Sequence, residues 1–282
     1  MLFVQYSIQR NLRLITLLGI STISAVMAVY AGNIRVKGSS TVLPIAQKTA
    51  EVFMKNHKEH SIVVEGGGSG VGIAALMDGI ADIANISRKV KAKEFKKFEQ
   101  KGIDAKVNAV GRDALSVIVN PRNPVKSLTM DQIEAIFTGK IENWKHVGGP
   151  DMAIVPISRE SSSGTYEFFK THVLSKKEYT SKCLASSSNG AMVQSVSQTE
   201  GAIGYCGLAF VNDQVHPLNI GEKEKSVEPG FKNAQAGTYP LVRDLNMVTA
   251  GEPKGLVREY LDFVFSAEGQ AIVKEVGYIP VK

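Results

Sequence analysis

Apolar positions along the chain follow two alternating patterns. Short apolar runs are typical of strands, and they predict strands at 34–37, 61–65, 82–87, 107–110, 115–119, 152–157 and 201–205. Apolar residues at helical spacing predict helices at 45–53, 75–80, 89–101, 130–137, 166–173, 192–196, 256–265 and 267–276. Residues 221–237 are polar and show neither pattern, which indicates a surface segment. Strands and helices alternate almost throughout, which favours an α/β fold with a mostly parallel sheet.

Three of the predicted strands lead into helices through residues rich in hydroxyl groups or glycine. These junctions are 38–44 (Gly-Ser-Ser-Thr-Val-Leu-Pro), 66–72 (Gly-Gly-Gly-Ser-Gly-Val-Gly) and 159–165 (Arg-Glu-Ser-Ser-Ser-Gly-Thr). In an open α/β sheet the carboxyl ends of the strands share one edge, where helix N-termini converge. We therefore expect the three junctions to lie near one another.

The chemistry of the junctions favours binding of an oxyanion. Backbone N–H groups at a helix N-terminus, the hydroxyls of Ser163 and Thr165 and the guanidinium of Arg159 could surround one point, where the helix dipole favours negative charge. Glycine lets backbone amides approach a ligand closely. The alternative is structural: Ser163 would cap a helix, Arg159 would lie on a solvated surface, and 39–41 would cap the helix that begins near Pro44.

Signatures of an enzyme or a metal site are missing from the sequence. The junction 66–72 lacks the Lys-Ser/Thr of a nucleotide-triphosphate loop and the spacing of a dinucleotide loop. Neither Ser69 nor Ser163 lies in the Gly-x-Ser-x-Gly pattern of a nucleophilic serine. His57 and His60 share a helix-face spacing but have no third ligand nearby. We predict a binding protein with no catalytic residue, metal or cofactor, and keep a secreted phosphatase-like hydrolase as the alternative.

The N-terminal residues suggest export. Arg10 and Arg13 precede a charge-free apolar run, 14–31, that ends in small residues, which predicts a signal peptide at 1–31 with cleavage after Ala28 or Ala31. An uncleaved membrane anchor is the alternative. In an oxidising compartment Cys183 and Cys206 could pair, or Cys206 could simply be buried in its apolar run.

The charge is modest for a nucleic-acid-binding protein. The formal net charge is +6, and removal of Arg10 and Arg13 with the signal peptide would lower it to +4. Lysines gather in the predicted helix 89–101, where they alternate with apolar residues at helical spacing. We interpret this helix as a solvated one with an apolar stripe and expect no nucleic acid as a partner.

Five sequence motifs resemble those of a known family. They are Gly-Ser-Ser-Thr-Val-Leu-Pro at 38–44, Glu-Gly-Gly-Gly-Ser-Gly-Val-Gly at 65–72, Ile-Phe-Thr-Gly-Lys-Ile-Glu-Asn-Trp at 136–144, Arg-Glu-Ser-Ser-Ser-Gly-Thr at 159–165 and Gly-Ala-Ile-Gly-Tyr at 201–205. In this order they resemble the periplasmic phosphate-binding proteins of Pst-type ABC transporters, over nearly the whole mature chain. The resemblance implies the type II periplasmic binding protein fold, with two α/β lobes joined by a two-pass hinge. Lobe 1 would be 32–115 plus 245–282, and lobe 2 would be 116–244, with hinge strands near 116–120 and 239–243.

The resemblance also implies a ligand and a set of binding residues. Inorganic phosphate would lie between the lobes, and the protein would deliver it to ABC transporter permease subunits in the inner membrane. We expect a periplasmic monomer that needs no cofactor. The family's ligand-binding positions match Ser40, Thr41, Val42, Ser69, Ser87, Arg159, Ser163, Gly164 and Thr165.

Two positions depart from the better-known members of this family. Those members have an aspartate beside the strand-end serine, where it accepts the proton of hydrogen phosphate, and a second aspartate two residues after the arginine. This chain has Arg88 and Ser161 there. Arg88 could contact the anion or hold a neighbouring carboxylate, and we favour the second role. The proton acceptor could be a hydroxyl oxygen or one of the carboxylates Glu65, Asp82 and Glu160. Another oxyanion, such as sulfate or molybdate, is the alternative ligand.

Overall fold

The computed structural model describes residues 31–281. Residues 1–30 of the predicted signal peptide therefore lie outside the described part of the chain. Among the described helices, none combines the length and the apolar character that a membrane span requires.

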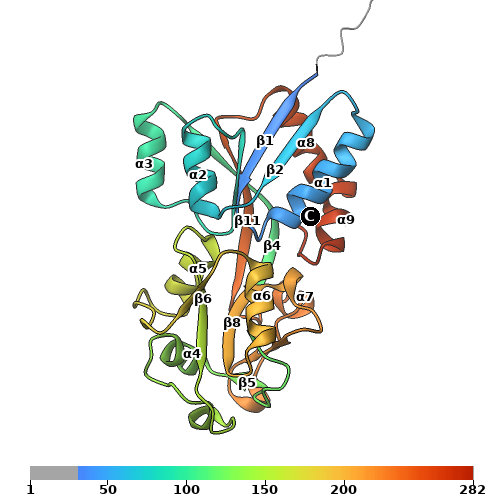
Figure 1. The fold of residues 1–282 in the computed structure, drawn as a ribbon. Coiled ribbons are helices and arrows are strands. Elements are labelled where there is room, and N and C mark those ends of the chain that lie inside the picture. The colour runs from blue at the N-terminus through green and yellow to red at the C-terminus, as the bar shows by residue number, and fades with distance from the viewer. Residues whose placement is uncertain (1–30, 282) are drawn as a thin grey trace, which may run out of the picture. The chain divides into compact units, whose positions relative to one another are not determined.

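The described residues form strands that alternate with helices (Figure 1). The strands are β1 (Asn33–Gly38), β2 (Ser61–Glu65), β3 (Ile83–Ile86), β4 (Ala105–Val119), β5 (Ser127–Leu128), β6 (Val155–Arg159), β7 (Leu184–Ser186), β8 (Ala202–Gly207), β9 (His216–Pro217), β10 (Asn219–Ile220) and β11 (Val242–Ala250). The α-helices are α1 (Leu43–Asn56), α2 (Ser69–Met77), α3 (Ala92–Gln100), α4 (Met130–Phe137), α5 (Gly164–His172), α6 (Asn189–Gln198), α7 (Phe231–Gln235), α8 (Gly255–Phe265) and α9 (Ala267–Glu275). Short 3₁₀ turns occupy Trp144–Val147, Leu208–Phe210 and Lys223–Lys225.

The main sheet is parallel at its two ends and antiparallel in its middle. Its strand order is β2-β1-β3-β11-β4-β8-β6-β7, with β9 beside β4. β1 runs parallel to β2 and β3, and β6 runs parallel to β7 and β8. β11 is antiparallel to β3 and β4, and β4 is antiparallel to β8. The predicted parallel arrangement therefore holds for the ends, and it is wrong for the centre, where two long strands connect the two parallel sets.

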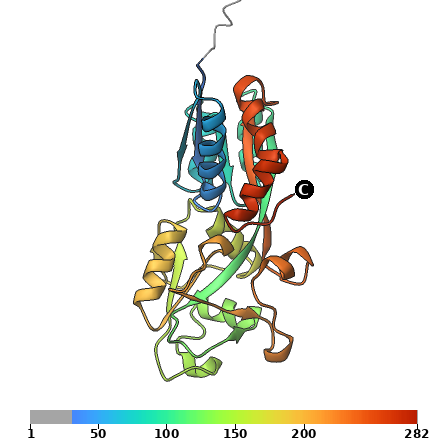
Figure 2. The ribbon, with the colours of Figure 1, turned by 90° about the vertical axis from the view of Figure 1, so that its right-hand side faces the viewer.

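The strand β4 is longer than the sequence pattern predicted. The two predicted strands at 107–110 and 115–119 are parts of one strand, which pairs first with β11 and then with β8. The polar residues Arg112 and Asp113 interrupt the apolar pattern without interrupting the strand, because Asp113 has a hydrogen-bonded partner in the interior. β4 and β11 run side by side through the middle of the ribbon (Figures 1 and 2).

Apolar side chains gather in separate large clusters toward the two ends of this central pair. One large cluster contains Phe137, Trp144, Phe169 and Tyr205, and its members come from 114–241 with Ile279. The second large cluster joins α1 to α8, which are far apart in the sequence but adjacent in space, as Figure 2 also shows. Its members come from 34–110 and 245–278.

Helix starts match the predicted caps in some places and not in others. Thr129 caps α4 and Ser266 caps α9, as predicted. The prediction that 39–41 cap α1 is wrong: the N-cap residue is Val42, without a side-chain cap, and Pro44 lies in the first turn. The segment 221–237 lies mostly at the surface, as predicted, and contains the short helix α7, which its sequence pattern did not reveal. Cys183 and Cys206 do not pair, and Cys206 is buried.

Candidate anion-binding site

Three junctions of the N-terminal half meet through hydrogen bonds. β1, β2 and β3 are parallel neighbours, so their carboxyl ends lie at one edge of the sheet. Ser39 Oγ donates to Ser87 Oγ at 2.9 Å, and the Ser87 N–H donates to Ser69 Oγ at 3.1 Å. The hydroxyl-rich turn after β1, the glycine-rich turn after β2 and the end of β3 therefore form one polar cluster.

The junction after β6 completes this cluster from the other side. The Thr41 and Thr165 hydroxyls are 3.1 Å apart, and Arg159 Nη2 donates to Ser40 Oγ at 3.2 Å. Gly164 packs against Ser69 and Ser87, and a Cβ on this glycine would lie 2.7 Å from Ser87 Oγ. The structure thus brings together, and buries, all the predicted site residues: Ser40, Thr41, Val42, Ser69, Ser87, Arg159, Ser163, Gly164 and Thr165.

Arg159 is a buried cation without a carboxylate partner among the described residues. Its side chain donates from Nε to Ser186 O at 3.0 Å, and from Nη2 to Ser187 O at 2.9 Å and to Ser40 Oγ. Its Nη1 is buried and has no hydrogen-bond partner in the described part of the chain. Burial lowers the pKa of Arg159 to about 10, so the guanidinium remains charged at neutral pH. A buried charge with a free donor is stabilised by an anion that accepts from it.

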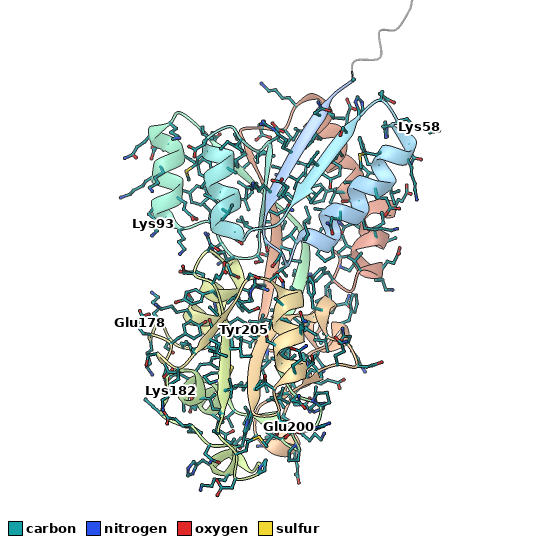
Figure 3. All side chains as sticks on the ribbon, viewed as in Figure 1. Lys58, Lys93, Glu178, Lys182, Glu200 and Tyr205 are labelled. Carbon is teal, nitrogen blue, oxygen red and sulfur yellow. The ribbon has the colours of Figure 1, made fainter. Side chains whose placement is uncertain are left out.

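The Tyr205 hydroxyl fixes the backbone of Arg159 through a hydrogen bond. Its hydroxyl contacts Ser158 Oγ at 3.0 Å and Tyr179 Oη at 2.8 Å, and it accepts from the Arg159 N–H at 3.3 Å. Burial raises the pKa of Tyr205 to about 12, so this hydroxyl is neutral and supplies no counter-charge. Figure 3 shows Tyr205 in the interior, whereas the labelled Glu178 and Glu200 lie at the periphery.

Ser163 acts as a helix cap and remains available as a donor. Its Oγ accepts from the N–H groups of Thr165 at 3.1 Å and Tyr166 at 3.3 Å. The hydroxyl proton is not used in these bonds. The two alternatives for Ser163 are therefore compatible, because the cap occupies the oxygen lone pairs and leaves the proton at the positive end of α5.

Asn189, the first residue of α6, is a site residue that sequence reasoning missed. Its Nδ2 donates to Thr41 Oγ1 at 3.1 Å and to Ser40 Oγ at 3.3 Å, and its Oδ1 accepts from the Gly207 N–H at 3.3 Å. The side chain is fully buried. A signal was present, since 186–190 (Ser-Ser-Ser-Asn-Gly) is a fourth passage from a strand through hydroxyl residues into a helix.

Asp113 and Arg243 form a buried ion pair behind the site, which the sequence did not reveal. Arg243 Nη2 and Nε donate to Asp113 Oδ2 at 2.8 and 3.0 Å. Arg243 also donates from Nη1 to Ser87 O at 3.1 Å and lies over the Phe168 ring, 5.4 Å from its centroid. The two residues face each other across β4 and β11, so only the register of these strands brings them together.

Arg88 holds a carboxylate, as predicted. Its Nη1 and Nη2 donate to the two oxygens of Glu94 at 2.8 and 2.7 Å, and the Lys91 N–H donates to the same carboxylate at 2.8 Å. Burial raises the pKa of Glu94, but the hydrogen bonds from Arg88 and Lys91 outweigh it, and the net shift is downward.

The three carboxylates suggested as proton acceptors are not buried with the predicted site residues. Glu65 pairs with Lys37 at 2.9 Å and is half-exposed. Asp82 pairs with Arg35 at 3.1 Å at the start of β3, the end of that strand opposite Ser87. Glu160 is exposed. Of the acceptors considered from sequence, this leaves the hydroxyl oxygens.

Comparisons with known proteins agree with this geometry. The family model of the PBP superfamily domain matches residues 28–268. The phosphate-binding protein PstS of Bacillus subtilis is 36% identical over 256 residues, which cover 89% of this chain and 81% of that protein.

Two solved structures share the fold. One is a putative phosphate ABC transporter substrate-binding protein with bound phosphate from Clostridium perfringens, with a TM-score of 0.82, 34% identity and coverage of 89% of this chain and 100% of that one. The other is an ABC-type phosphate transport receptor from Vibrio cholerae, with a TM-score of 0.71, 30% identity and coverage of 87% and 99%. The expected type II periplasmic binding protein fold is confirmed. This chain belongs to the PBP superfamily and, within it, to the family of the phosphate-binding protein PstS.

Proposed function

We propose that this protein is a solute-binding protein that captures inorganic phosphate and delivers it to an ABC transporter permease. The observation that carries the proposal is Arg159, which is buried, charged and free at Nη1, and which donates from Nη2 to Ser40 in the cluster of hydroxyl groups. Neutral donors and one guanidinium can hold a dianion without burying several unpaired cations. The relatives named as phosphate-binding proteins or phosphate transport receptors support the choice of ligand.

The proposed ligand-binding residues are the nine predicted from sequence. Ser40, Ser163 and Thr165 would donate from hydroxyls, and Arg159 would donate from Nη1. The first N–H groups of a helix have no partner within it, so Gly164 at the start of α5 would offer its amide. Val42 would offer its amide from the N-cap of α1.

We further propose that the ligand stabilises a closed arrangement of two lobes. Lobe 1 would be 32–115 plus 245–282, and lobe 2 would be 116–244, an assignment supported by the separate apolar clusters. Ser40, Ser69 and Ser87 would come from lobe 1, whereas Arg159 and 163–165 would come from lobe 2. A ligand that bridges both lobes favours closure in proportion to its preference for the closed state. The β4–β11 pair would be the hinge, and the exported monomer would act in the periplasm.

Calorimetric titration of the purified protein, freed of bound anion, tests this proposal. We expect tight binding of phosphate and much weaker binding of sulfate. The control variant is Arg258→Met, since Arg258 is an exposed arginine whose ion pair, among the described residues, is with Asp262, and this variant should bind phosphate as the parent does. Absence of phosphate binding, or sulfate binding of equal strength, would contradict the proposal.

A further inference from the structure

The hydrogen-bonding capacity of the site decides where a proton on the ligand can go. A serine or threonine hydroxyl has one proton to donate and two lone pairs that accept. Inorganic phosphate near neutral pH is a mixture of the monoanion and the dianion, because its second pKa lies near 6–7, and both forms keep at least one proton because the last pKa lies far above neutrality. A site that fits hydrogen phosphate therefore needs one acceptor among many donors.

Two serines of the site can only donate to a ligand. Ser40 Oγ accepts from Arg159 Nη2 at 3.2 Å and from Asn189 Nδ2 at 3.3 Å. Ser163 Oγ accepts from the N–H groups of Thr165 and Tyr166. Both lone pairs of each oxygen are thus occupied, and only the hydroxyl protons remain for the anion.

Ser69 and Ser87 differ from this pair. In the described part of the chain Ser69 Oγ accepts one hydrogen bond, from the Ser87 N–H, and Ser87 Oγ accepts one, from Ser39 Oγ. Each keeps one lone pair. Both hydroxyls are fully buried and lie against Gly164, at the positive end of α5.

No carboxylate competes with these two hydroxyls. Asp113 is the one fully buried carboxylate in the described part of the chain, and both of its oxygens are engaged. Its Oδ2 accepts twice from Arg243, and its Oδ1 accepts from the Leu208 N–H at 2.9 Å.

We infer that the Ser69 and Ser87 hydroxyl oxygens, which both lie against Gly164, act together as the one acceptor and share the proton of hydrogen phosphate, while Ser40 and Ser163 donate to its unprotonated oxygens. The inference rests on the proposed function and adds the determinant of selectivity. An anion without a proton gives the free lone pair of these serines no donor, so that a buried acceptor stays unsatisfied, whereas hydrogen phosphate satisfies it.

The test compares phosphate with monofluorophosphate, in which fluorine replaces the protonated oxygen, so that the dianion has no proton to donate. The variants are Ser69→Ala and Ser87→Ala, with Ser40→Ala as the matched control. We expect the parent protein to prefer phosphate, and each of the first two variants to reduce this preference by about tenfold, the effect of one hydrogen bond. Ser40→Ala should weaken binding of both anions by the same factor.

Several outcomes would overturn the inference. Equal affinity of the parent protein for phosphate and monofluorophosphate would overturn it, and this result does not depend on whether a variant folds. A preference that stays unchanged in both Ser69→Ala and Ser87→Ala, or one that collapses in Ser40→Ala, would also refute it. A parent protein that binds neither anion would instead refute the proposed function.

Discussion

Arg159 and Arg243 are both buried, and the partners of their charges differ. Arg159, at the end of β6, is 2% exposed, and Arg243, on β11, is 5% exposed. Arg243 binds Asp113 with two nitrogens and is an internal ion pair. Arg159 contacts only hydroxyl and carbonyl oxygens, and its Nη1 has no partner within the described residues.

The presence or absence of a carboxylate partner distinguishes Arg243, a structural arginine, from Arg159, the proposed ligand-binding arginine. A charge removed from water is costly unless an opposite charge compensates it. At Arg243 the protein itself provides the compensation, so this guanidinium can fix β4 against β11 and hold Ser87 O. At Arg159 we propose that a bound anion provides the compensation. Burial alone would not distinguish the two arginines, whereas burial combined with the partner does.

Replacing Arg159 tests whether this arginine is needed for phosphate binding rather than for stability. Arg159→Met removes the charge but retains much of the side-chain volume. We expect phosphate affinity to fall by about a hundredfold to a few thousandfold, since losing a buried charged partner typically costs about 3–5 kcal/mol. Without phosphate, the free energy of unfolding should stay the same or rise, because an unpaired buried cation has been removed.

Calorimetry and urea unfolding would measure the two effects separately. Arg258→Met serves as the control for loss of an arginine elsewhere on the protein. Tight phosphate binding by Arg159→Met would show that the site has been assigned to the wrong residues.

Replacing Asp113 tests whether its ion pair with Arg243 stabilises the folded protein. Asp113→Asn leaves Arg243 buried without a counter-charge, and the free energy of unfolding should fall by about 3 kcal/mol. Urea unfolding in the absence of phosphate would measure this. The double variant Asp113→Leu/Arg243→Met removes both charges together and should recover most of the loss. Unchanged stability of Asp113→Asn would mean that the ion pair is not a structural element.

The junctions of the site could be predicted from sequence because their signals are local. A strand, a few hydroxyl or glycine residues and a helix follow one another within about ten residues, and the parallel arrangement then places the junctions after β1 and β2 at one edge. The junction after β6 meets them from the other parallel set, because the strands between the two sets are antiparallel. Even the error at 39–41 is instructive. Hydroxyls before a helix usually cap it, but here Val42 is the N-cap residue, and Ser39, Ser40 and Thr41 turn toward the site.

The ion pair and the central strands could not be predicted because their causes are distant in sequence. Asp113 and Arg243 are 130 positions apart, and only the register of β4 with β11 joins them. In each strand the polar residue weakens the apolar alternation that would have revealed the strand. Asn189 is an intermediate case: its junction was visible, but its contact with Ser40 and Thr41 depends on how distant segments pack.

Asn189 tests whether the hydroxyl groups near Arg159 need a fixed orientation, because its amide donates hydrogen bonds to Ser40 and Thr41. Asn189→Ala removes the amide that donates to Ser40 and Thr41 and leaves the Gly207 N–H without its acceptor. We expect phosphate affinity to fall by about tenfold, as for loss of roughly one buried hydrogen bond. Calorimetry would measure the change, with the exposed Asn212→Ala as control. Affinity within twofold of the parent would show that the hydroxyls need no such support.

Lys91 and Glu167 give the smallest expected effect, because they are charges that water still reaches. Lys91 Nζ lies 2.6 Å from Glu167 Oε2, and the side chains are 28% and 33% exposed. The pair links the turn before α3 to α5, on opposite sides of the proposed cleft. Partly solvated ion pairs contribute about 0.2–1 kcal/mol, so we expect Lys91→Met to weaken phosphate binding by at most about fivefold.

The loss should appear mainly as faster dissociation, which stopped-flow measurements can follow, and should shrink at high salt because the charges are screened. The charge-reversed pair Lys91→Glu/Glu167→Lys should recover the affinity, whereas Lys170→Met, which breaks an ion pair with Glu178 on one side of the cleft, should not change it. A loss as large as that of Arg159→Met would contradict the comparison, because a solvated pair would then matter as much as a buried, uncompensated charge. A salt-dependent few-fold change would instead make Lys91 and Glu167 a third case. Both charges of this pair are present, but water screens their attraction, so that the pair contributes little to binding.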